Sequence, residues 1–199
     1  MTEIFLRPAK RSDAADLAIL DNVASHGISL WFWQEAVAHG KGENPMELGR
    51  MRMADDDAFF GWRNAVVAAR DEEVLGSITN YIMSPLEEED DEDEFKESAS
   101  PFIPIFELFD LVNGHWFIDS LGVYGHARGN GIATMLVDDS LTKARNSEAG
   151  LASLVVEDSN TVARRIYESR GFEIADKRPY VEYDGPSETK EWLLMSTRL

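Results

Sequence analysis

The chain has no cysteine among its 199 residues. This absence excludes disulfide bonds, zinc–thiolate sites and thiol nucleophiles, and it is typical of proteins kept in a reducing cytoplasm. No apolar run approaches the roughly 20 residues that cross a bilayer. The first residues also lack the basic and apolar regions of a signal peptide. We therefore expect a soluble, cytoplasmic protein.

Basic residues are scarce, because 19 Lys and Arg stand against 37 Asp and Glu and give a formal net charge of −18. This balance disfavours a nucleic-acid partner, whose phosphates need a surplus of basic side chains. It equally disfavours docking on an anionic membrane surface. Hydrophobic residues make up 44% of the chain, enough for a core. The length fits one domain, and we expect residues 1–199 to form it.

The acidic residues are unevenly distributed. Residues 1–127 hold 9 basic and 25 acidic side chains, a net charge of −16, whereas residues 128–199 hold 10 and 12, a net charge of −2. Eight consecutive acids occupy positions 87–94. Such a block repels itself and cannot be buried, so we expect an acidic surface insertion at about 84–101. The alternative is an electrostatic attraction for a cationic partner or substrate.

Hydrophobic patterning predicts an α/β fold with a β-α-β-α unit in its middle. The predicted strands are 4–7, 65–69, 74–83, 115–123, 151–156, 172–183 and 191–199. The predicted helices are one capped by Ser12 or Asp13 and running toward Gly27, then 28–38, 46–53, 132–145 and 160–169. The apolar segment 103–112 fits a helix or a strand.

The most informative segment is the glycine-rich stretch 121–133, where a predicted strand ends and a predicted helix begins. Glycines let the backbone approach a ligand, and N–H groups at a helix start bind anions such as a pyrophosphate. A Walker loop is excluded because its Lys is missing. A dinucleotide fingerprint fails at Thr134, where its third glycine would stand. A plain glycine-rich turn is the structural alternative.

Two motifs follow one another at a defined distance. Residues 128–133, Arg-Gly-Asn-Gly-Ile-Ala, fit the pattern Arg/Gln-x-x-Gly-x-Gly/Ala, and residues 160–172 fit Asn-x-x-Ala-x-x-x-Tyr-x-x-x-Gly-Phe in full. Together they resemble the GNAT superfamily of acyl-CoA-dependent N-acyltransferases over about residues 115–173. One departure is Gly125, where the family often has proline. The resemblance implies a single GNAT-like domain with a mixed, mostly antiparallel sheet of six or seven strands, splayed at the CoA site and flanked by helices.

The resemblance also implies how acetyl-CoA, the acyl donor, would be held without a metal. Its pyrophosphate would lie on the N–H groups of residues 128–133, and its pantetheine arm along residues 121–123. The N–H of Val123 would stabilise the oxyanion, while Asn160 would bond the pantetheine arm, cap its helix, or do both. The implied cofactor-binding residues are Leu121, Val123, Arg128, Gly129, Asn130, Gly131, Ile132, Ala133 and Asn160.

Two residues are implied to be catalytic. Tyr167 matches the family tyrosine near the CoA sulfur, so it is a candidate general acid, with a core aromatic as the alternative. Asp119 lies four residues before Val123 on the same predicted strand and is a candidate base, acting through a water. An ion pair or the binding of a cationic acceptor is its alternative role, and Glu157 is a second candidate base. Side chains 119, 121 and 123 share one face unless a bulge intervenes.

Aromatic and acidic side chains gather in the segments that line the acceptor site in this fold. The aromatic ones are Trp31, Trp33, Phe59, Phe60, Trp62, Tyr81 and Tyr180. They suit a small cationic amine, although core packing or a homodimer contact would use the same residues.

The resemblance therefore predicts an N-acetyltransferase that acts by direct attack on acetyl-CoA in a ternary complex, because no cysteine is present to carry the acyl group. Its partner would be a small-molecule amine. A non-catalytic acyl-CoA-binding module and a nucleotide-binding α/β protein are the alternatives.

Overall fold

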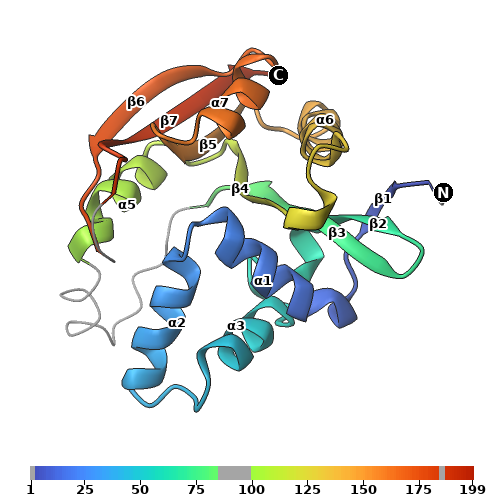
Figure 1. Cartoon of the computed structure of the whole chain (residues 1–199). Coiled ribbons are helices and arrows are strands. Elements are labelled where there is room, and N and C mark those ends of the chain that lie inside the picture. Colours follow the sequence, from blue (N-terminus) through green and yellow to red (C-terminus); the bar gives the residue numbers. More distant parts are fainter. Residues whose placement is uncertain (1–2, 85–99, 184–186) are drawn as a thin grey trace. The chain divides into compact units, whose positions relative to one another are not determined.

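The computed structural model describes residues 3–84, 100–183 and 187–199, so the predicted acidic insertion lies almost wholly outside the described residues. The fold is α/β, as predicted, with seven strands in the order β1-β2-β3-β4-β5-β7-β6 (Figure 1). Contacts divide the chain into a first unit, residues 1–81 and 118–143, and a second unit, residues 82–117 and 144–199. The prediction of a single domain over residues 1–199 stays a prediction.

The first unit contains most of the helices. Its elements are β1 (Phe5–Pro8), α1 (Ala14–Ala24), α2 (Ile28–Ala38), α3 (Pro45–Met53), β2 (Ala65–Arg70), β3 (Glu73–Ile82), the end of β4 (Trp116–Val123) and most of α6 (Ile132–Arg145). Strands β1, β2 and β3 pair antiparallel, and α1 and α2 both pack against α3 (Figure 1). The predicted bounds of α2 and α6 are confirmed.

Ser12 or Asp13 is the predicted cap of α1, and Asp13 stands at the N-cap position, but its side chain makes no capping bond to the helix. The Asp13 carboxylate instead accepts two hydrogen bonds from Arg7, at 2.7 and 3.1 Å, and one from the Lys10 N–H at 2.7 Å. These bonds close a short 3₁₀ turn over Arg11–Asp13, from which α1 continues. The Arg7 guanidinium is a stronger, charged donor than a helix N–H group, so the carboxylate serves the turn and β1 rather than the helix.

Close packing of α3 on α2 depends on Gly49. A Cβ atom at this position would lie 2.6 Å from the Trp33 ring, so a larger residue would push the helices apart. Trp33 is accordingly 4% exposed and belongs to the core. Of the two roles left open for Trp33, its burial supports core packing over lining an acceptor site.

The second unit is a layer of strands with two short helices. Its elements are α5 (Ile103–Asp110), the start of β4, β5 (Leu151–Glu157), α7 (Thr161–Glu168), β6 (Glu173–Pro179) and β7 (Glu191–Arg198). Strand β4 pairs with β5 in parallel over Trp116–Ala152 and Phe117–Ser153, and β7 pairs antiparallel with β5 and β6. The splay expected between β4 and β5 stays a prediction.

The structure gives the conformation of the segment after residue 102 and the end of strand β6. The segment after residue 102 is the helix α5, with Pro104 in its first turn, where the missing N–H is harmless. Strand β6 ends at Pro179, before the predicted residue 183. The aromatic rings that follow leave the strand for other partners, because Tyr180 packs on Trp192 at 5.0 Å and Tyr183 on Phe102 at 4.8 Å between ring centroids.

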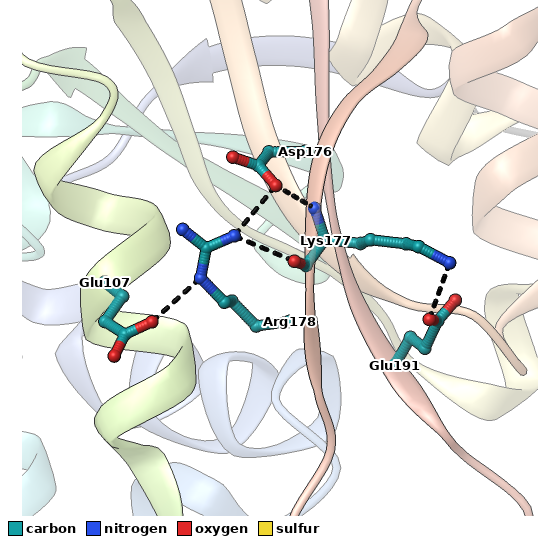
Figure 2. Close-up of polar contacts among 5 residues, drawn as sticks. All are labelled: Glu107, Asp176, Lys177, Arg178 and Glu191. Atoms are coloured by element: carbon teal, nitrogen blue, oxygen red, sulfur yellow. Dashed lines mark hydrogen bonds and ion pairs between the residues drawn. The ribbon is translucent and has the colours of Figure 1, made fainter.

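Charged side chains join α5 to β6 (Figure 2). Arg178 donates from Nε to Glu107 and from a terminal nitrogen to Asp176, each at 2.8 Å. Lys177, on the same strand, pairs with Glu191 of β7 at 2.7 Å. These pairs are largely exposed, so they orient α5 on the strands more than they stabilise the fold.

No helix among the described residues is long and apolar enough to cross a membrane.

Candidate active site

The glycine-rich loop connects β4 to α6 in the first unit. After Val123 the chain forms a short 3₁₀ turn over Gly125–Ala127 and then an exposed loop up to the first residue of α6. Gly129 and Gly131 have φ angles of +79° and +75°, which L side chains rarely adopt, so the loop requires glycine at both positions. The Asn130 amide donates to the Ala127 carbonyl at 3.0 Å and fixes the turn.

This loop ends at the first turn of α6, whose N–H groups have no acceptor within the helix. They carry the positive end of the helix dipole and form an anion site. Arg128 is exposed beside them, and its Nε donates to the Val123 carbonyl oxygen at 3.2 Å. Ile132 contributes backbone alone, because its side chain is buried against Gly76. The structure thus brings Val123 and residues 128–133 together, while their role with CoA stays a proposal.

A pair of carboxylates, Asp119 of β4 and Asp21 of α1, also lies in the first unit. Asp119 of β4 accepts a hydrogen bond from the phenol of Tyr81 on β3. Asp21 of α1 accepts one from Ser29 of α2 at 2.6 Å and another from Ser120, the neighbour of Asp119. Four elements therefore converge on two carboxyl groups that repel each other when both are ionised.

Their surroundings change the acidity of both groups. The residue Asp119 keeps some exposed surface, yet its carboxyl is covered enough that burial, and then the charge of Asp21, raise its pKa to about 7. Burial also raises the pKa of Asp21, although the two serine bonds act against the shift. The pKa of Tyr81 is raised by burial and by Asp119, so its phenol stays a hydrogen-bond donor. Asp119 can therefore take up and release a proton near neutral pH.

Asp119 and Ser120 are consecutive, yet both turn toward the side of the sheet that α1 covers. Asn80 bonds Ser140 of α6 at 2.9 Å, so the next residue, Tyr81, lies on the opposite face with its partner Asp119. Ser120 reaches Asp21 on that same face. Two consecutive side chains on one face indicate a bulge, so Asp119 does not share a face with Val123, whose side chain lies beside Gly76.

The remaining predicted residues belong to the second unit. Tyr167 is 6% exposed and its ring lies 5.8 Å from that of Phe172. Burial raises its pKa, which keeps the phenol protonated and able to donate. Asn160 caps α7 by accepting from the Ala163 N–H at 3.2 Å, a bond that uses the amide oxygen and not the nitrogen. Glu157 is buried at the end of β5.

A sequence model of the acetyltransferase (GNAT) family matches residues 28–172, which is most of the chain and includes both motifs. The chain belongs to the GNAT acetyltransferase family. No curated protein sequence matches it significantly. Solved structures that share the GNAT fold include an acetyltransferase with a TM-score of 0.66 at 20% identity, covering 98% of each chain.

Two further structures of this fold carry printed functions. An N-acetyltransferase from Staphylococcus aureus Mu50 has a TM-score of 0.62 at 15% identity, covering 97% of this chain and 100% of its own. The Salmonella typhimurium protein YncA, in a structure with its cofactor acetyl-CoA, has a TM-score of 0.59 at 13% identity, covering 99% and 94%. At such identities the likeness shows the fold alone.

One site residue of this GNAT protein was missed from the sequence. Asp21 reads as part of the polar face of a helix, and nothing in its neighbours along the chain marks it as a partner of β4. Tyr81 was among the aromatic candidates but had no assigned partner. Within the described ranges no group of three or more His, Asp or Glu residues is placed to hold a metal ion.

Proposed function

We propose that this chain is an acyl-CoA-dependent N-acetyltransferase that moves the acetyl group of acetyl-CoA to a primary amine by direct attack in a ternary complex. The acceptor is a small cationic amine. The observation that carries the proposal is Asp119, a carboxyl on β4 that is held by Tyr81 and has its pKa raised to about 7. A base for an amine works best when it titrates near the operating pH.

The donor side of the proposal rests on the loop before α6. Open N–H groups at the helix start, two glycines with positive φ and the exposed Arg128 suit the pyrophosphate of CoA. The relative YncA, whose structure holds acetyl-CoA, has the same fold. Val123, next to this loop, would offer its N–H to the thioester oxygen, and the amide nitrogen of Asn160 would contact the pantetheine arm.

In the proposed reaction, the acetyl group moves from sulfur to nitrogen and the ammonium group loses two protons. The ammonium group gives one proton to Asp119 through a water, and the free amine attacks the thioester carbon, so that a C–N bond forms. The nitrogen then loses a second proton to solvent, and the C–S bond breaks with its electron pair on sulfur. Tyr167 gives its proton to that sulfur and regains one from solvent. The products are an N-acetyl amide and free CoA thiol.

The acceptor side combines negative charge with an aromatic surface in the first unit. The Phe59 ring lies 5.6 Å from the Tyr81 ring and is 54% exposed, although it is held in place near the carboxylates. Its segment is fixed by the Asn64 amide, which donates to the Phe59 carbonyl at 2.9 Å. A carboxylate pair with an exposed ring beside it favours an alkylammonium over an anionic acceptor.

A thiol-release assay with acetyl-CoA tests the proposal against a panel of diamines, amino sugars, amino acids and a peptide N-terminus. We expect turnover with a small cationic amine and a fall of about 100-fold in kcat/KM for Asp119→Asn. Calorimetry should show unchanged CoA binding for this variant. Asp110→Asn, an exposed carboxylate of α5, is the matched control. CoA binding without thiol release from any amine would support the non-catalytic module instead.

A further inference from the structure

We propose that Asp21 is a positioning residue of the acyl transfer, which acts through Asp119 and makes that residue the proton acceptor for the amine. The proposal rests on the proposed function, since it concerns the same site. Asp21 lies on α1, outside the two sequence motifs, and it reaches β4 through the hydroxyl of Ser120.

The placement of Asp21 follows from a close approach between two backbones. A Cβ atom at Gly122 would fall directly on the Leu20 carbonyl group, so α1 lies against β4 with no side chain between them. Leu20 is fully buried at this contact. The next residue along the helix is Asp21, and two residues back along the strand is Ser120. The contact therefore sets the distance between α1 and the strand that carries Asp119.

Hydroxyl groups then fix the direction of the Asp21 carboxylate. Ser29 donates to its Oδ2 at 2.6 Å and is itself 3.0 Å from the hydroxyl of Ser25, on the last turn before α2. Asn22 holds the same junction, because its side-chain oxygen accepts from the Leu30 N–H at 3.0 Å. A carboxylate that accepts from two hydroxyls at a rigid helix junction cannot turn away from its neighbour without losing both bonds.

These bonds decide which carboxylate of the pair takes the proton. Ser29 and Ser120 both favour the charged form of Asp21, whereas Asp119 has one donor, Tyr81. When two carboxylates lie together, the charge of one makes the other a stronger base. The charged or titratable groups that act on Asp119 are Asp21 from α1 and Tyr81 from β3, and the α2 residue at this cluster, Ser29, does not titrate. Asp21 therefore keeps its charge and Asp119 exchanges the proton.

The deciding experiment compares the wild type with Asp21→Asn, which keeps the shape and an oxygen for Ser29 but removes the charge. Carboxyl ¹³C NMR with labelled aspartate follows the titration of Asp119, assigned by its loss in Asp119→Asn. We expect the midpoint to fall by about one pH unit in Asp21→Asn, and the acid limb of kcat/KM to move with it. Asp21→Glu should return the Asp119 midpoint and the acid limb of kcat/KM toward their wild-type values. Melting temperature and CoA calorimetry show that each variant is folded.

The matched control is Asp16→Asn, which removes the same charge from the same helix. Asp16 accepts from the Tyr124 hydroxyl at 2.7 Å and does not act on Asp119, so neither readout should move. An unchanged Asp119 midpoint in a folded Asp21→Asn variant would overturn the proposal, as would a shifted midpoint without a shifted acid limb. Failure of the proposed function looks different, because no amine would then release thiol while the NMR titration still reports on the carboxylate pair.

Discussion

Arg128 donates a hydrogen bond from Nε to the carbonyl oxygen of Val123 at 3.2 Å, across the turn between β4 and α6. This bond joins the strand end that is proposed to hold the thioester to the loop that is proposed to hold the pyrophosphate. It uses Nε, so the terminal guanidinium nitrogens are further donors that an anion could accept from. One side chain thus connects the two parts of the donor site.

Substituting Arg128 should separate its charge from this bond. We expect Arg128→Lys to weaken CoA binding by about threefold, since a positive charge remains, and Arg128→Ala by about tenfold. The fold should be unaffected, because the side chain is exposed. Calorimetric titration with CoA at two salt concentrations measures the effect. Equal affinities for all three proteins would show that Arg128 does not contact the phosphates.

The two roles of Asn160 can be separated by isosteric substitution. Asn160→Asp keeps an oxygen that caps α7 through Ala163, but it removes the amide nitrogen proposed to contact pantetheine. We expect Asn160→Asp to keep the stability of the wild type, while its KM for acetyl-CoA rises roughly tenfold. Asn160→Ala should in addition lose about 1 kcal/mol of the free energy of unfolding. Urea melts and initial rates measure both, and an unchanged KM in Asn160→Asp would leave capping as the role of this residue.

Tyr167→Phe tests the proposed acid. The ring packs against Phe172, so phenylalanine should preserve the fold, while the proton for the thiolate is lost. We expect kcat to fall by about tenfold or more with little change in KM. A decrease of less than about threefold would contradict the acid role. Tyr124→Phe is the control, since it loses a structural bond to Asp16 and should keep its kcat.

The raised pKa of Asp119 predicts how the free energy of unfolding depends on pH. Its folded pKa, raised to about 7, lies above that of an unfolded aspartate, so the folded state binds the proton more tightly. The stability that Asp119 contributes in its protonated form is fully present below the unfolded pKa of about 3.8 and is lost as the pH rises through the folded pKa of about 7. Asp119→Asn should therefore be more stable than the wild type at pH 8, by on the order of 2 kcal/mol, and equal to it near pH 4. Urea unfolding at the two values checks the difference, and a constant difference at both would contradict a raised pKa.

Much of the fold could be predicted from local patterns. The bounds of α2 and α6 follow from apolar periodicity between helix-breaking glycines, and Gly171, shortly after α7, has a φ of +82°, a left-handed conformation typical of a glycine after a helix. The family resemblance rests on two motifs whose residues recur at fixed spacing along the chain. Such features are visible in one sequence because they depend on neighbours along the chain.

Features that depend on distant contacts could not be predicted. The pairing of Asp13 with Arg7, the burial of Trp33 on Gly49 and the convergence of Asp21 and Asp119 each need two elements to meet. Sequence spacing puts Asp119 on the face of Val123 unless a bulge intervenes, and the bond of Asp119 to Tyr81 indicates the opposite face. A bulge shifts the alternation by one residue, and one sequence carries no signal for it.

The glycine at position 122 has a consequence for altering acceptor preference by design. Any side chain there would have to move the backbone of α1, because the obstacle is the Leu20 carbonyl and not a flexible group. Helix α1 is therefore an unsuitable place to introduce variation, and a library that randomises it would lose folded members. The side chains of Phe59 and Phe60 are exposed and meet no such obstacle, so new acceptors are better sought by varying these two side chains, with the carboxylate pair kept fixed.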